Sequence, residues 1–285
     1  MKKIDITRIL WMKLAKDENK FIRTLARVRQ GVQNVISYKQ IEEMIFTQQI
    51  PVEVIDAAQK EYAKWLANDL KEYYKKYTKE GIQKIAEAFQ RKLNYDKVLV
   101  YVDKWILERG ANLVTKICED QRLTLRAILH KFVIEEPKSP EELSHYIRSV
   151  VGLTERQTNA LLKMRDALLE QGLPENKINK IIAKQAKDMH IFRARMIART
   201  ELSFAYNRGT LAEMEDIVTE YQFEQVEKIW ITAPDEFVCE DCARMNGTRI
   251  SLDNEFQSPA AKGNELLLTP PLHPNCRCSL VYEVR

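Results

Sequence analysis

The chain has 285 residues, of which 45% are hydrophobic and 30% are charged, a balance typical of a globular protein rather than a disordered one. It holds 8 glycines, which favours a helix-rich body and leaves little material for a glycine-rich phosphate-binding loop. No apolar run approaches the roughly 18 residues of a membrane-spanning helix, so no membrane partner is expected. Asp5, Arg8 and Lys13 interrupt any secretory signal core, and the sequence therefore predicts assembly in a reducing cytoplasm.

Charge is distributed unevenly along the chain. Residues 221–285 hold ten Asp or Glu and six Lys or Arg, a balance of −4, so the total of +4 leaves +8 on residues 1–220. A basic body of this kind suits a position near nucleic acid or near an acidic protein surface. The same excess, spread over so long a segment, is also common in proteins that bind neither.

Residues 1–136 are predicted to form an N-terminal helical region. One helix face is marked by apolar side chains at steps of four, three and four residues: Leu66, Leu70, Tyr73 and Tyr77. Gly81 is expected to stop or kink this helix. The segment 95–110 contains β-branched residues suited to a strand, but helical patterns flank it, and we interpret it as helix. Cys118 is expected to be a small core residue.

Residues 137–225 are predicted to form a second helical region. Ser139 with Glu142, and Thr154 with Gln157, have the spacing of capping boxes and mark two helix starts.

A longer helix is expected to start at about His190. Small residues along one face of it permit the close approach of another helix. Glu201 lies on that face, where a buried acid needs a donor or a cation such as Arg199 or Arg208. A catalytic role for Glu201 is less favoured, because no partner acid or base stands beside it in the sequence.

The amino-acid composition changes in residues 226–285, where prolines concentrate. Three short segments alternate or run apolar like strands: 227–232, 248–252 and 278–284. Asn246-Gly247 is a turn signal between the first two. The sequence therefore predicts a mainly α chain, with a multi-helix N-terminal body and a small C-terminal β-rich module.

This module holds four of the 5 cysteines of the chain. The spacing Cys239-x-x-Cys242 lets two thiolates bind one ion from a tight knuckle, and His273-x-x-Cys276 repeats it with an imidazole. Cys278 is a fifth candidate. The second pair of ligands remains open among His273 with Cys276, His273 with Cys278, and the two cysteines alone, and we favour a pair that includes His273.

A structural zinc ion explains this cluster best. A module of about 60 residues buries little apolar surface, and zinc supplies on the order of 10 kcal/mol of folding free energy. A disulfide pair or a redox motif is less favoured, because a redox Cys-x-x-Cys usually opens a helix inside a βαβ pattern. A catalytic zinc ion would need an open coordination position and a general base, and no His-Glu-x-x-His motif is present.

Five motifs occur in a familiar order: GLTERQ at 152–157, IARTELSFAYNRG at 197–209, KIWITAPDEFVCEDC at 228–242, MNG at 245–247 and PPLHPNCRC at 270–278. With them the chain resembles the phage head morphogenesis, or minor head protein, family typified by the F protein of phage Mu and its relative in phage SPP1. The resemblance covers about residues 137–285 and is much less clear over 1–136.

The resemblance implies a low-copy, non-enzymatic structural protein of the virion, in the capsid interior or at the portal vertex, made in the host cytoplasm. Its implied partners are the portal protein, the major capsid or scaffolding protein and, for some members, double-stranded DNA. Two alternatives stand beside it. One is a DNA-binding virion protein that lines the path of the genome, and the other is a zinc-dependent hydrolase or nuclease with His273 in its active site.

Further residues are predicted to support the metal site. Trp230 is expected to anchor the module on the helical body, and Asp235 to cap or orient the knuckle loop. Arg277, between two cysteines, is a candidate partner for Asp235 or Glu201, or else a solvated side chain. Arg199 and Glu201 belong to the Arg-Thr-Glu motif of the family.

Overall fold

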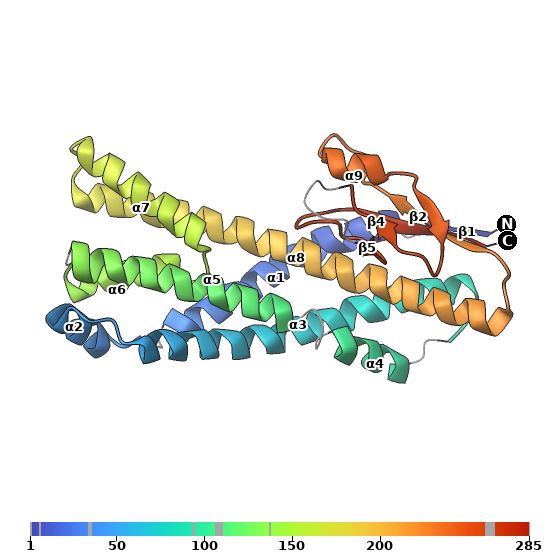
Figure 1. Ribbon diagram of the computed structural model, residues 1–285, viewed down its shortest axis with the longest axis horizontal. Helices are drawn as coiled ribbons and strands as arrows, with labels where there is room; N and C mark the ends of the chain where they lie inside the picture. The colour runs from blue at the N-terminus through green and yellow to red at the C-terminus, as the bar shows by residue number, and fades with distance from the viewer. Residues whose placement is uncertain are drawn as a thin grey trace. The chain divides into compact units, whose positions relative to one another are not determined.

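The computed structural model describes residues 2–5, 7–33, 36–92, 95–105, 111–136, 138–259 and 266–284. Helices make up most of them, and all strands but one lie between residues 226 and 284 (Figure 1). The predicted fold class, mainly α with a small C-terminal β-rich region, is confirmed. None of the described helices combines the length and the apolar character that crossing a membrane requires.

The chain divides into two compact units, each assembled from separate stretches. Unit 1 comprises Met1–Phe21, Leu70–Leu107 and Arg195–Arg285, and unit 2 comprises Ile22–Asp69 and Glu108–Ala194. Three long helices contribute residues to both: α1 (Thr7–Gln33), α3 (Val52–Ala88) and α8 (Glu175–Tyr221). The domain boundaries expected at residues 136 and 225 stay a prediction.

The described residues of unit 2 form helices joined by short loops, with no strand among them. Besides parts of the long helices it contains α2 (Tyr38–Thr47), α5 (Ala111–Leu129), the π-helix η2 (His130–Glu135), α6 (Pro140–Val150) and α7 (Glu155–Glu170). The capping boxes predicted at Ser139 and Thr154 are both present, and Ser37 forms a third. The Cys118 side chain lies outside the described part of the structure.

In unit 1, the helices α3 and α8 come into close contact at two glycines, Gly81 and Gly209. Tyr74 and Tyr77 of α3 are fully buried. A methyl group on Gly81 would lie 2.3 Å from the Tyr206 carbonyl oxygen, and one on Gly209 would lie 2.5 Å from that of Thr78. The expectation that Gly81 stops the helix is wrong, because α3 continues to Ala88. Glycine is needed there for close backbone approach rather than for a turn.

Two further segments follow the expected patterns. The segment that was ambiguous between strand and helix forms α4 (Tyr95–Trp105), as predicted. After α8, the chain forms the strands β2 (Val226–Ile231), β3 (Arg249–Ser251), β4 (Phe256–Gln257), β5 (Leu266–Leu267) and β6 (Ser279–Val284), with the short helix α9 (Glu240–Met245) between β2 and β3. The strands expected at 227–232, 248–252 and 278–284 are therefore confirmed.

The main sheet joins the two ends of the chain. Its order is β1-β6-β2-β3 with antiparallel neighbours, and β1 (Lys2–Asp5) pairs with β6 from Lys2 opposite Val284 to Asp5 opposite Val281. Figure 1 shows the blue first strand beside the red last strand. The sequence did not predict β1, so the β-rich part of the fold includes residues from the opposite end of the chain.

The sheet has a buried interior. All six residues of β6 are buried, and Trp230 and Tyr282 are completely enclosed. The hydroxyl groups of Tyr282 and of Thr210 in α8 form a hydrogen bond at 3.1 Å. The sheet and the C-terminal half of α8 are therefore held together by polar as well as apolar contacts.

Candidate metal centre

The five predicted donor residues gather at one end of the sheet. The donor atoms of Cys239, Cys242 and His273 all lie within 4.8 Å of one another, and so do those of Cys242, Cys276 and Cys278. Across the described ranges, three or more His, Cys, Asp or Glu donors are grouped in this way only here. Cys242 belongs to both groups and is the centre of the cluster.

Three separations within these groups are close to those around a tetrahedral ion. His273 Nε2 lies 3.0 Å from Cys239 Sγ and 3.1 Å from Cys242 Sγ, and the sulfurs of Cys242 and Cys276 are 3.7 Å apart. With Zn–S bonds of about 2.3 Å and Zn–N bonds of about 2.0 Å, tetrahedral geometry places two sulfurs about 3.8 Å apart and a sulfur and a nitrogen about 3.6 Å apart. A small outward movement of the imidazole is enough to admit zinc.

Local backbone structure explains the placement of the first pair. Cys239 is the N-terminal cap of α9, and its sulfur accepts a hydrogen bond from the Cys242 amide at 3.4 Å. This cap brings both sulfurs to the start of the helix. The Cys276 sulfur likewise accepts from the Cys278 amide at 3.5 Å. Amide hydrogens directed at sulfur stabilise thiolates, the form in which cysteine binds a metal.

His273 is oriented by its other ring nitrogen. Nδ1 lies 2.8 Å from the Pro274 carbonyl oxygen, which leaves Nε2 facing the two sulfurs. Such an outer contact fixes the tautomer and direction of a metal-binding imidazole. Burial lowers the pKa of His273, but the Pro274 carbonyl and the thiols of Cys276 and Cys239 outweigh it and raise the pKa overall.

Without a cation, the buried thiols compete for ionisation. Hydrogen bonds from Cys242 and Cys278 lower the pKa of Cys276 well below its usual range. Contacts with Cys276 and Cys278, together with burial, raise the pKa of Cys242 far above its usual range. Contact with Cys242 lowers the pKa of Cys278, but Cys276 and burial outweigh it and raise the pKa overall. Further thiolates need a positive ion to form, and a divalent metal supplies that charge.

Asp235 contacts both the knuckle loop and Arg277. Asp235 accepts a hydrogen bond from the Phe237 amide at 3.0 Å. Its carboxylate also accepts two hydrogen bonds from the guanidinium of Arg277, at 2.5 and 2.6 Å. Of the three states considered for Arg277, the structure shows pairing with Asp235. The Arg277 guanidinium lowers the pKa of Asp235. Burial opposes this effect, and the Phe237 amide adds to it.

The Arg-Thr-Glu motif, residues 199–201 of α8, contacts the loop between His273 and Cys276. Arg199 contacts Glu18 at 3.0 Å and the side chain of Asn275 at 3.2 Å. The Thr200 hydroxyl accepts from the Asn275 amide at 2.8 Å. Arg199 and Thr200 therefore fix the loop between His273 and Cys276 against α8.

Glu201 faces the interior of unit 1. It is buried, and it accepts a hydrogen bond from the Tyr74 hydroxyl at 2.5 Å. The expectation of a donor near this acid is met by a tyrosine, which had not been among the candidates. Sequence reasoning also missed Glu18 and Asn275. Only Asn275 carried a local signal, because asparagine after proline favours a turn.

Trp230 packs inside the module. Its ring meets Phe256 edge to face with centroids 5.1 Å apart. Its indole N–H makes no conventional hydrogen bond to nitrogen or oxygen within the described residues. Its contact with Cys278 acts to lower the pKa of that thiol, although other contacts outweigh it. A role for Trp230 in anchoring the module on the helical body stays a prediction.

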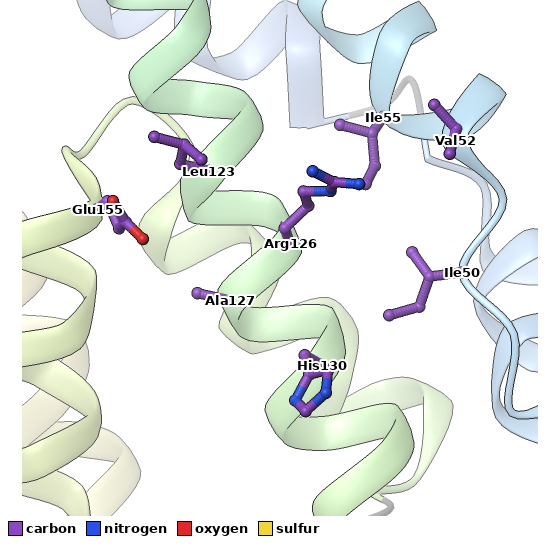
Figure 2. Close-up of a pocket in the computed structure, with 8 residues that line it drawn as sticks. All are labelled: Ile50, Val52, Ile55, Leu123, Arg126, Ala127, His130 and Glu155. Atoms are coloured by element: carbon purple, nitrogen blue, oxygen red, sulfur yellow. The ribbon is translucent and has the colours of Figure 1, made fainter.

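A hollow in unit 2 has none of the predicted site residues in its lining. Its volume is about 460 Å³, and Figure 2 shows the eight residues around it: Ile50, Val52, Ile55, Leu123, Arg126, Ala127, His130 and Glu155. His130 pairs with Glu135 at 3.2 Å. The lining contains neither a cysteine nor a cluster of metal donors, so the metal centre is the better candidate for a site.

Comparison with known proteins bears on the same region. Residues 162–281 match the family model described as Phage Mu protein F like protein. This segment is phage Mu F-like. The match confirms the family predicted from the motifs and includes all five metal-donor candidates. No match was found among curated proteins or among solved structures.

The phage Mu F-like segment is completed by residues from outside it. It begins within α7 and ends within β6. Glu18 of α1 and Tyr74 of α3 bind its Arg-Thr-Glu motif, and β1 extends its sheet. The N-terminal part of the chain therefore supplies contacts that the phage Mu F-like segment uses in its own interior.

Proposed function

We propose that this chain is a non-enzymatic structural protein of a phage head, with a C-terminal module held together by one zinc ion. The proposal is supported by two overlapping groups of three donors, which share Cys242 and come from residues 239–242 and 273–278 within the phage Mu F-like match. We infer from the family resemblance that this chain is a minor head protein associated with the portal.

The proposed ligands are Cys239, Cys242, His273 and Cys276. Cys276 is preferred to Cys278 because its sulfur lies 3.7 Å from that of Cys242 and accepts the amide hydrogen of Cys278. Four protein donors fill a tetrahedral zinc ion and leave no position for water or substrate. This donor count favours a structural site over the alternative of a zinc-dependent hydrolase.

The structural role follows from where the ligands lie. One pair lies at the start of α9 and the other precedes β6. One ion would therefore join the knuckle to the strand that pairs with both β1 and β2. Closing this long loop with a metal restricts the unfolded chain as well as binding the folded one. A module held in this way presents a fixed surface to a large assembly.

Metal analysis with a head-association assay tests the proposal. The purified chain should contain one zinc ion, and it should co-purify with assembled heads and bind the portal protein. Cys242→Ser should lose the metal and the association together. Cys118→Ser, which removes the cysteine outside the cluster, is the matched control and should keep both. Absence of the wild-type chain from heads, or a zinc content near zero, would reject the corresponding part of the proposal.

A further inference from the structure

A run of lysines without acids occupies the first part of α8, in unit 2. Residues 176–187 contain four lysines and no Asp or Glu. All four are exposed, and we call them the lysine stripe: Lys177, Lys180, Lys184 and Lys187. Asp188 follows directly and ends the acid-free run.

Helical geometry gathers these four side chains on one face. At about 100° per residue, the four positions fall within an arc of about 80°. The opposite side of the same turns carries Ile178, Ile182 and Ala186, which are buried. The helix is therefore packed by its apolar side, and the lysine stripe faces solvent along a line of about 15 Å.

The lysine stripe carries more positive charge than its own helix neutralises, since Asp188, one turn after Lys184, is the single acid beside it on that face of α8. None of the four lysines forms an ion pair with an acid in the described residues, whereas the buried arginines of the same unit do. Arg165 pairs with Glu136 at 2.9 Å, and Arg193 pairs with Asp120 at 3.0 Å. Four like charges close together on one helix face cost free energy, and a polyanion bound there would remove that cost.

The residue type distinguishes between two classes of partner. Lysine is depleted in protein–protein interfaces, where aromatic side chains and arginine carry the binding energy. Lysine is common at phosphates, which it neutralises as a flexible point charge. Duplex DNA carries one charge per about 1.7 Å of axis, so about 15 Å of duplex offers about nine phosphates to the stripe.

We propose that the lysine stripe of α8 binds the phosphate backbone of double-stranded DNA without sequence preference. The choice of DNA over another polyanion rests on the proposed function, because a head protein meets packaged duplex DNA. The geometry and charge of the stripe are independent of the metal centre. The stripe therefore adds a DNA contact surface to the proposed structural role.

Salt-dependent binding of a mixed-sequence 30-base-pair duplex tests this surface. Each phosphate contact lowers the slope of log K against log salt by about 0.9, so four contacts contribute about −3.6. Changing all four stripe lysines to glutamine should remove most of this contribution and weaken binding at 100 mM salt by about tenfold or more. The corresponding four arginine substitutions keep the charge and should retain binding.

Four lysines elsewhere provide a matched control. Lys39, Lys60, Lys64 and Lys75 are also exposed but lie among acids on α2 and α3. Changing them to glutamine removes the same total charge and should leave the salt slope within about one of the wild-type value. Circular dichroism should be the same for both variants.

Three results would overturn the inference. Equal losses in the stripe and control variants would show that net charge alone attracts DNA. An unchanged slope in the stripe variant would show that DNA binds elsewhere or not at all. Stripe-dependent binding of polyglutamate, without binding of the duplex, would identify an acidic protein as the partner instead. None of these results affects head association or zinc content, so the proposed function fails or stands separately.

Discussion

The backbone amide of Asn275 donates a hydrogen bond to the Thr200 hydroxyl at 2.8 Å, across 75 positions of sequence. Asn275 has a φ of 65°, in the left-handed region that asparagine tolerates better than most residues. It lies between His273 and Cys276, two of the proposed ligands. The direction in which that loop presents its donors therefore depends on α8.

Thr200→Val should weaken the metal centre from a distance. The substitution removes the acceptor for the Asn275 amide while keeping the size of the side chain. We expect a loss of about 1 kcal/mol in the free energy of unfolding and of about tenfold in zinc affinity. Urea unfolding and competition with a chelator measure the two effects. Thr200→Ser keeps the hydroxyl and should resemble the wild type in both, and equal zinc affinity of the valine and wild-type chains would contradict the coupling.

Cys276→Ser and Cys278→Ser should differ in metal binding. If Cys276 is the fourth ligand, its replacement leaves three protein donors and weakens zinc binding strongly. Replacement of Cys278 should leave one zinc ion bound, with a modest loss of affinity. Cobalt substitution checks this, because the intensity of the thiolate-to-cobalt absorption follows the number of bound sulfurs. A Cys278 variant with fewer cobalt-bound sulfurs than the wild type would assign the fourth position to Cys278 instead.

Much of the module was predictable because its signals are local. The alternation in 227–232 and 278–284 predicts β2 and β6, and the spacing of Cys239 and Cys242 predicts a knuckle. The choice between Cys276 and Cys278 was not predictable. It depends on the left-handed turn at Asn275 and on the Cys278 amide that faces the Cys276 sulfur, and neither appears in residue spacing.

Contacts between distant parts of the chain were the least predictable. The strand β1 covers four residues and gains its partner only from β6, at the far end of the chain. Nothing in a lysine-rich start predicts that pairing. Gly81 shows the same limit, because a glycine in a helical pattern usually indicates an end, and only the position of Gly209 reveals the close approach that requires it.

Gly81→Ala should destabilise the protein, although helix propensity alone predicts the opposite. In a free helix the change stabilises by about 1 kcal/mol. Here the added carbon would lie 2.3 Å from a backbone oxygen, which cannot move aside as a flexible side chain would. Overpacking of this kind costs about 1–3 kcal/mol, so we expect a net loss in urea unfolding. A gain in the free energy of unfolding would mean that α3 and α8 are not in close contact at Gly81.

Lys228 should make stability depend on pH in the alkaline range. Its side chain is completely buried, and its Nζ has no hydrogen-bond partner within the described residues. The Phe256 ring lies 5.6 Å from that nitrogen. Burial lowers the pKa of Lys228 to about 8 from 10.5, although Glu215 opposes the change. Between these values the unfolded chain binds more protons than the folded one, so the free energy of unfolding rises with pH across that window.

Lys228→Met should remove this rise and stabilise the protein at neutral pH. Methionine fills a similar volume without a charge, and the shift corresponds to a gain of up to about 3 kcal/mol. Urea unfolding of both chains between pH 7 and pH 11 measures it. Cysteine and tyrosine side chains titrate in the same range, so the difference between the two chains is the relevant quantity. Lys64→Met, at an exposed position, is the control and should leave the pH profile unchanged. Parallel profiles for the wild-type and Lys228→Met chains would show that the buried ammonium has a partner in solution.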